Sequence, residues 1–68
     1  MTNNQLWSGW FRWDTQDSWR KIQTAETKEA CELLTQIQYR SRLISFRDKN
    51  ISYAEYVVLP SEVDPNVE

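Results

Sequence analysis

Hydrophobic positions near the start of the chain follow the alternating spacing of β-strands. Residues 6–13 read LWSGWFRW and residues 18–24 read SWRKIQT, and both runs are rich in residue types that favour strands. The DTQD between them, residues 14–17, consists of turn formers. Two such runs joined by a short loop predict an N-terminal β-hairpin.

A register for this hairpin follows if Trp13 pairs with Ser18 across the loop. Phe11 then pairs with Arg20, and Gly9, the only glycine of the chain, pairs with Ile22. Each cation of the hairpin lies across from a ring, Lys21 from Trp10 and Arg12 from Trp19. One face of the hairpin holds mainly large apolar side chains: Trp7, Phe11, Trp13 and Ile22. The other face alternates rings with cations: Trp10, Arg12, Trp19 and Lys21. We interpret the first face as core and the second as exposed, although a register shift of one residue would exchange them.

The next segment has the spacing of an α-helix. Thr27 is suited to cap its N-terminus. Apolar residues then recur three and four positions apart: Ala30, Leu33, Leu34 and Ile37. The other side of the helix is polar: Lys28, Glu32, Thr35 and Gln36. We therefore predict a helix over residues 28–40 that packs its apolar side on the sheet, with Leu34 buried.

The last third of the chain returns to strand composition. Residues 43–47 read LISFR and residues 51–59 read ISYAEYVVL, with a DKN turn between them. This predicts an α+β fold of ββαββ order, in which one helix packs on one face of a small antiparallel sheet. In the alternative, the helix continues through about Leu43, the strand after it is lost and the order is ββαβ.

The length of 68 residues allows a single small domain, residues 1–68. Pro60 removes a backbone donor and is expected to end the last strand. Residues 1–5 are polar and residues 61–68 are acidic, so both ends are predicted to be flexible.

Composition disfavours several kinds of chemistry. The chain has one cysteine and no histidine, which excludes an intramolecular disulfide and a structural Cys/His zinc site. No imidazole is present to act as a general base near neutral pH. Cys31 lies early in the predicted helix, where a nucleophilic thiol is one interpretation and a small buried residue is the one we favour. We expect a protein that is not an enzyme and that uses neither metal nor cofactor.

No membrane or export segment is indicated. The N-terminal MTNNQLW lacks the basic and apolar regions of a signal peptide, and no apolar run approaches the length needed to span a bilayer. A single unpaired cysteine suits a reducing compartment. We therefore expect a cytoplasmic location.

The ring-and-cation face of the hairpin supports two binding hypotheses. Its four residues, Trp10, Arg12, Trp19 and Lys21, combine stacking surfaces with positive charge, as proteins that bind single-stranded nucleic acid do. The net charge of −2 argues against a protein that mainly binds phosphates. Tryptophan and arginine are also enriched at protein interfaces. We prefer a protein-interaction module, with a homodimer as one form of it, and keep single-stranded nucleic-acid binding as the alternative.

The last strand is apolar on both sides, and one helix cannot cover both faces of a sheet. A second copy of the chain could cover the remaining side, which makes Tyr53, Tyr56 and Val58 a candidate self-association strand. The C-terminal segment could cover it instead, or these side chains could border an edge and stay half exposed.

Overall fold

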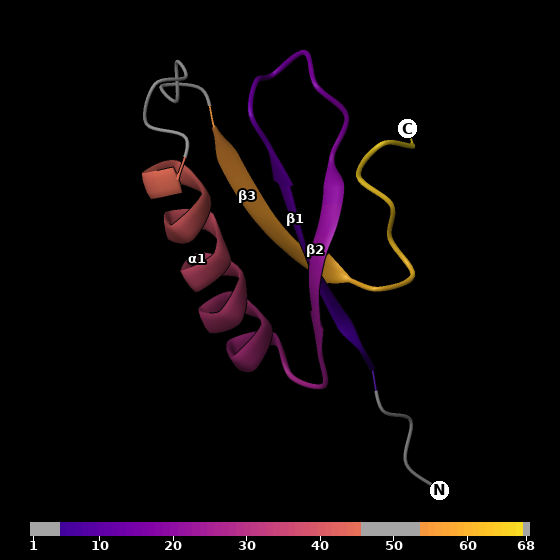
Figure 1. Cartoon of the computed structure of the whole chain (residues 1–68). Coiled ribbons are helices and arrows are strands. Elements are labelled where there is room, and N and C mark those ends of the chain that lie inside the picture. Colours follow the sequence, from indigo (N-terminus) through magenta and orange to yellow (C-terminus); the bar gives the residue numbers. More distant parts are fainter. Residues whose placement is uncertain (1–4, 46–53, 68) are drawn as a thin grey trace, which may run out of the picture.

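The computed structural model describes residues 5–45 and 54–67. In these ranges the elements are β1 (Trp7–Arg12), β2 (Arg20–Ala25), α1 (Lys28–Ser45) and β3 (Glu55–Pro60). The strands form an antiparallel sheet in the order β2-β1-β3, and α1 lies along one face of it (Figure 1). The predicted α+β architecture is confirmed, with the ββαβ order that the sequence offered as the alternative.

Helix α1 is longer than the main prediction. It begins at Lys28, as predicted, and Thr27 caps it, because its Oγ1 accepts a hydrogen bond of 3.1 Å from the Ala30 amide. It continues to Ser45, so the strand predicted from residue 43 is wrong for residues 43–45, and the rest of that segment lies outside the described residues. A short apolar run suits helix and strand alike, and extending an existing helix requires no new nucleus.

The β1–β2 hairpin has the predicted register only near its loop. Two predicted pairs are confirmed there: Trp10 with Lys21 and Phe11 with Arg20. The register then shifts by one residue, so that Gly9 pairs with Gln23 and Ile22 is the extra residue of a bulge. The predicted pairing of Gly9 with Ile22 is therefore wrong. A bulge of this kind changes no hydrophobic spacing near the loop, which is why the sequence pattern missed it.

The centre of the sheet and the helix approach each other closely at Gly9. A Cβ atom on Gly9 would lie 2.8 Å from both Cβ and Cγ2 of Thr35, closer than side-chain carbons can approach. Only small helix residues fit at this distance, and both Cys31 and Thr35 are fully buried there. The Cys31 Sγ lies 3.7 Å from the Thr35 Oγ1. The predicted burial of Cys31 is confirmed, whereas Thr35 belongs to the core and not to an exposed polar side.

Helix α1 consequently turns its aliphatic side away from the sheet. The exposed fractions of its large aliphatic side chains are 59% at Leu33, 39% at Leu34, 55% at Ile37 and 73% at Ile44. The side toward the sheet carries smaller or polar groups: Cys31, Thr35, Gln38, Tyr39 and Arg42. The prediction of a buried Leu34 is wrong. The physical reason is the close approach at Gly9, which leaves no room for leucine between the helix and β1.

Phe11 is the centre of the core and is 2% exposed. Its ring contacts Trp13 edge-to-face at 4.9 Å between centroids and Tyr39 of α1 at 6.0 Å. Tyr39 in turn contacts Tyr56 of β3 at 4.9 Å. This chain of rings joins β1, α1 and β3, so aromatic packing supplies the core that aliphatic helix residues do not. The predicted core position of Phe11 is confirmed.

Candidate functional site

The sheet has a second face that α1 does not cover. Because Gly9 and Phe11 face the helix, Trp10 and Arg12 point to this second face. The two predicted cation–ring pairs are present on it. The Arg12 Cζ lies 4.2 Å from the centroid of the Trp19 ring, and the Lys21 Nζ lies 5.5 Å from that of the Trp10 ring.

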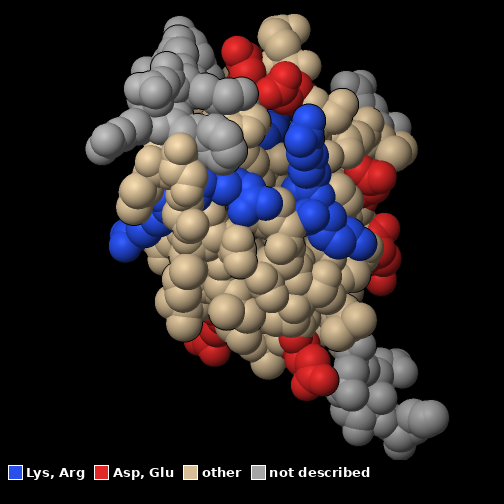
Figure 2. Space-filling model, in the orientation of Figure 1, with Lys and Arg blue, Asp and Glu red and all other residues tan. Residues whose placement is uncertain are grey.

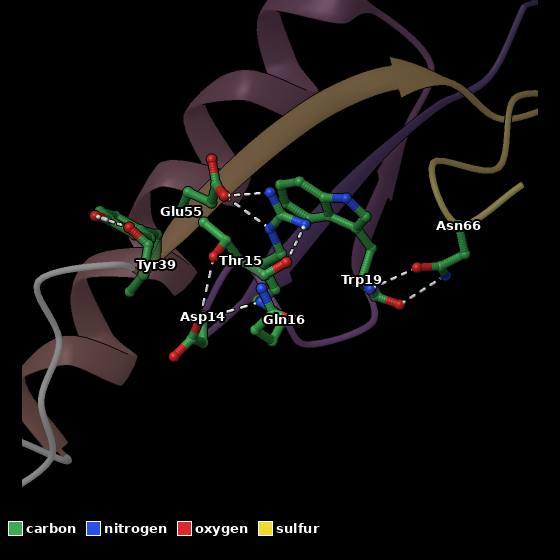
Figure 3. A network of polar contacts seen from close by, with 9 residues as sticks. Asp14, Thr15, Gln16, Trp19, Tyr39, Glu55 and Asn66 are labelled. Atoms are coloured by element: carbon green, nitrogen blue, oxygen red, sulfur yellow. Dashed lines mark hydrogen bonds and ion pairs between the residues drawn. The ribbon is translucent and has the colours of Figure 1, made fainter. Parts of the chain in front are cut away.

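The Arg12 guanidinium makes three contacts within the protein, to Glu55 and to Thr15, both of which are labelled in Figure 3. Its Nε donates a hydrogen bond of 2.7 Å to the Glu55 Oε2, and its Nη2 forms an ion pair with the same oxygen. Its Nη1 donates to the Thr15 carbonyl at 3.3 Å. The charge of Arg12 is therefore compensated by Glu55, and each of its three nitrogens already contacts an acceptor of the protein. A phosphate group would have to displace these contacts.

Trp10 is buried, with an exposed fraction of 8%, so the prediction that it is exposed is wrong. Its indole Nε1 has no hydrogen-bond partner among the described residues. Lys21 and Val57 flank it as cross-strand neighbours. Trp19 is half-buried. The four residues of the predicted binding face thus lie together, but they do not form an open platform for stacking bases.

The segment after β3 runs along the second face. The hydroxyls of Ser8 and Ser61 are 2.7 Å apart. The Asn66 side chain brackets the Trp19 backbone, since its Oδ1 accepts from the Trp19 amide at 2.6 Å and its Nδ2 donates to the Trp19 carbonyl at 3.0 Å (Figure 3). Figure 1 shows this segment, in yellow, on the side of the sheet away from α1. The flexibility of residues 61–68 stays a prediction, but residues 61 and 66 make contacts that shield this face.

Two residues of the candidate self-association strand, Tyr56 and Val58, lie on the helix side of the sheet. Tyr56 packs on Tyr39, and Val58 pairs with Gly9 on the same side of the sheet. The Tyr39 hydroxyl also donates to the Ala54 carbonyl at 3.3 Å. Tyr53 lies outside the described residues. Tyr56 and Val58 are half-buried on the side of the sheet that carries α1, and their role in self-association stays a prediction.

Four of the exposed large aliphatic side chains among the described residues lie on α1. We call the side of the helix that carries them the outer stripe, and it consists of Ala30, Leu33, Leu34, Ile37 and Ile44. These positions recur every three, four or seven residues, which places them along one side of the helix. Exposed aliphatic side chains that gather along one side of a helix, rather than singly, are a common feature of interaction surfaces.

The exposed charge that flanks the outer stripe is negative near one end and positive near the other. Near the N-terminus of α1, Lys28 and Glu29 are both exposed, but the Lys28 Nζ lies 5.8 Å from the Trp7 ring centroid, on the other side of the helix from the stripe, so Glu29 is the charge that flanks the stripe. Near the C-terminus, the Arg42 Cζ turns inward to 5.7 Å from the Phe11 ring centroid, so Arg40 is the exposed charge. Figure 2 shows basic side chains in the upper half of this face and acidic ones at its top, right and lower edges, with a wide uncharged surface below the basic ones.

Residues 5–45 and 54–67 were also searched for a metal site, a membrane-spanning helix and an accessible thiol. No group of three or more His, Cys, Asp or Glu side chains is placed to hold a metal ion there. Among the same residues, no helix combines the length and the apolar character needed to cross a membrane. Cys31 is buried against Thr35 and is out of reach of a substrate in this conformation.

Comparison of the chain with protein-family models, with curated proteins and with solved structures finds no match. The candidate site therefore rests on the residues themselves. Sequence reasoning identified most of the outer stripe by its helical spacing but assigned it to the core. The sequence does contain a signal that the stripe faces outward. Gly9 and two small helix residues one turn apart, Cys31 and Thr35, allow the sheet and the other side of the helix to approach closely.

Proposed function

We propose that this protein is a non-enzymatic protein-interaction module that binds its partner through the outer stripe of α1. The observation that carries the proposal is the outward orientation of Leu33, Ile37 and Ile44, each more than half exposed. Burying a fully exposed side chain of this kind contributes about 1.5–3 kcal/mol, and burying the exposed part of each of these three contributes more than half of that. A small domain that leaves this free energy unused in its own fold can gain it on association.

The alternative function receives less support. Binding of single-stranded nucleic acid needs open rings and free cations. Trp10 is buried, and the Arg12 guanidinium is held by Glu55. The observations therefore favour a protein partner. In keeping with the single thiol of Cys31, we place the protein in the reducing cytoplasm.

The first test uses a photo-crosslinking amino acid, benzoylphenylalanine, placed at Ile37 and expressed in the native host. Because Ile37 lies in the middle of the outer stripe, we expect irradiation to give one defined adduct. The matched control carries the same group at Glu32, which is exposed on the same helix but lies off the stripe. We expect no comparable adduct from this position.

The mass of the adduct identifies the partner. Twice the mass of the chain means a second copy, and any other single mass means a different protein; both support the proposed function. Absence of an adduct from Ile37, or equal adducts from Ile37 and Glu32, would contradict it.

A further inference from the structure

We propose that the partner of the outer stripe is a second copy of this chain, bound with the two α1 helices antiparallel. This inference rests on the proposed function and specifies its partner. The observation behind it is a pair of exposed charged residues beside the stripe, Glu29 near its N-terminal end and Arg40 near its C-terminal end.

Glu29 and Arg40 lie on the same flank of the stripe. They are eleven residues apart, which is close to three full helical turns, so their side chains project in nearly the same direction. Leu33 and Ile44 continue the same row of the helix surface, one turn beyond each of them. Neither charged residue has an ion-pair partner among the described residues. Each charge is therefore available to a partner that lies along the stripe.

A two-fold axis perpendicular to α1 makes this surface complementary to itself. Such an axis reverses the second helix, so that Glu29 of one copy approaches Arg40 of the other, and the reverse. In a parallel arrangement the axis runs along the helices and places the flanks of the two copies on opposite sides of the interface, so Glu29 of one copy would not meet Arg40 of the other. The antiparallel dimer alone pairs both opposite charges while it buries the aliphatic side chains between the helices.

The test is sedimentation velocity at low ionic strength, where surface charges are least screened. Glu29→Arg makes both ends of the stripe basic, and Arg40→Glu makes both ends acidic. Each variant alone is expected to self-associate roughly tenfold more weakly than the wild type, because two contacts per dimer change from attraction to repulsion. An equimolar mixture of the two is expected to form a heterodimer at least as tightly as the wild type forms its dimer.

The matched control is Glu32→Arg, the same change of charge at an exposed position of α1 off the stripe. It is expected to leave self-association unchanged, and circular dichroism checks that every variant keeps its helix. A monomeric wild type, or a mixture that associates no better than its components, would overturn the antiparallel dimer. If the Ile37 crosslink still yields an adduct with another protein, the proposed function stands with a different partner; if it yields none, both proposals fail.

Discussion

Replacing Gly9 with alanine is expected to destabilise the domain by about 2–3 kcal/mol, the upper part of the range for overpacked cores. The new methyl group would lie 2.8 Å from Cβ and Cγ2 of the fully buried Thr35. Thr35 is short and stands on the helix backbone, so α1 itself would have to move away from β1. Urea unfolding followed by tryptophan fluorescence measures the loss.

A double variant shows whether this contact is the cause. Thr35→Ala removes the hydroxyl and Cγ2 and leaves only Cβ close to the new methyl group. Gly9→Ala combined with Thr35→Ala is therefore expected to cost at least about 1 kcal/mol less than the sum of the single changes. Additive losses, or a Gly9→Ala variant as stable as the wild type, would mean that the helix does not pack where the structure places it.

Phe11→Ala is expected to be the more damaging change, with a cost of about 3–5 kcal/mol. The ring is 2% exposed and contacts Trp13 and Tyr39, so its loss leaves a cavity where β1 meets α1. A domain of this size has a small stability margin, and the variant should be largely unfolded by circular dichroism at 25 °C.

Leu33→Ala is the matched control for Phe11→Ala. It also truncates a large apolar side chain, but one that is 59% exposed on the outer stripe. At low protein concentration, where self-association does not contribute, its cost should stay within about 0.5 kcal/mol. If Leu33→Ala costs as much as Phe11→Ala, the aliphatic side of α1 faces the sheet after all.

Much of the fold could be predicted from local sequence. Turn residues 14–17 located the hairpin, and Thr27 located the start of the helix. The hydrophobic pattern also identified Phe11 as core. These features depend on neighbouring residues, which a single sequence displays directly.

The orientation of α1 could not be predicted in the same way. An apolar stripe shows that one side of a helix is buried against something, but the partner can be the sheet of the same chain or another molecule. Two tertiary contacts decide the question here: Gly9 against Thr35, and Tyr39 against Tyr56. Both join residues far apart in sequence, and neither belongs to the helical pattern.

The second face of the sheet shows a similar limit. Sequence spacing correctly placed Arg12 on Trp19 and Lys21 on Trp10. It did not reveal that Glu55 neutralises Arg12 or that Asn66 brackets the Trp19 backbone. These partners come from the other end of the chain. The rings and cations that suggested a nucleic-acid surface in the sequence therefore mostly contact other residues of the same chain.

In this structure α1 packs its small residues on the sheet and exposes its aliphatic side. The most direct test of this arrangement is to measure how fast a thiol reagent labels a cysteine on each of these two sides. The wild type presents Cys31, which is fully buried, and a Cys31→Ala, Leu33→Cys variant presents a thiol on the outer stripe. In dilute solution we expect the thiol at position 33 to react like a free thiol. Cys31 should react roughly a hundredfold more slowly, since it must wait for a local opening that costs about 3 kcal/mol. Rapid labelling of Cys31 with protection at position 33 would contradict the account, because α1 would then pack its aliphatic side on the sheet and leave no outer stripe.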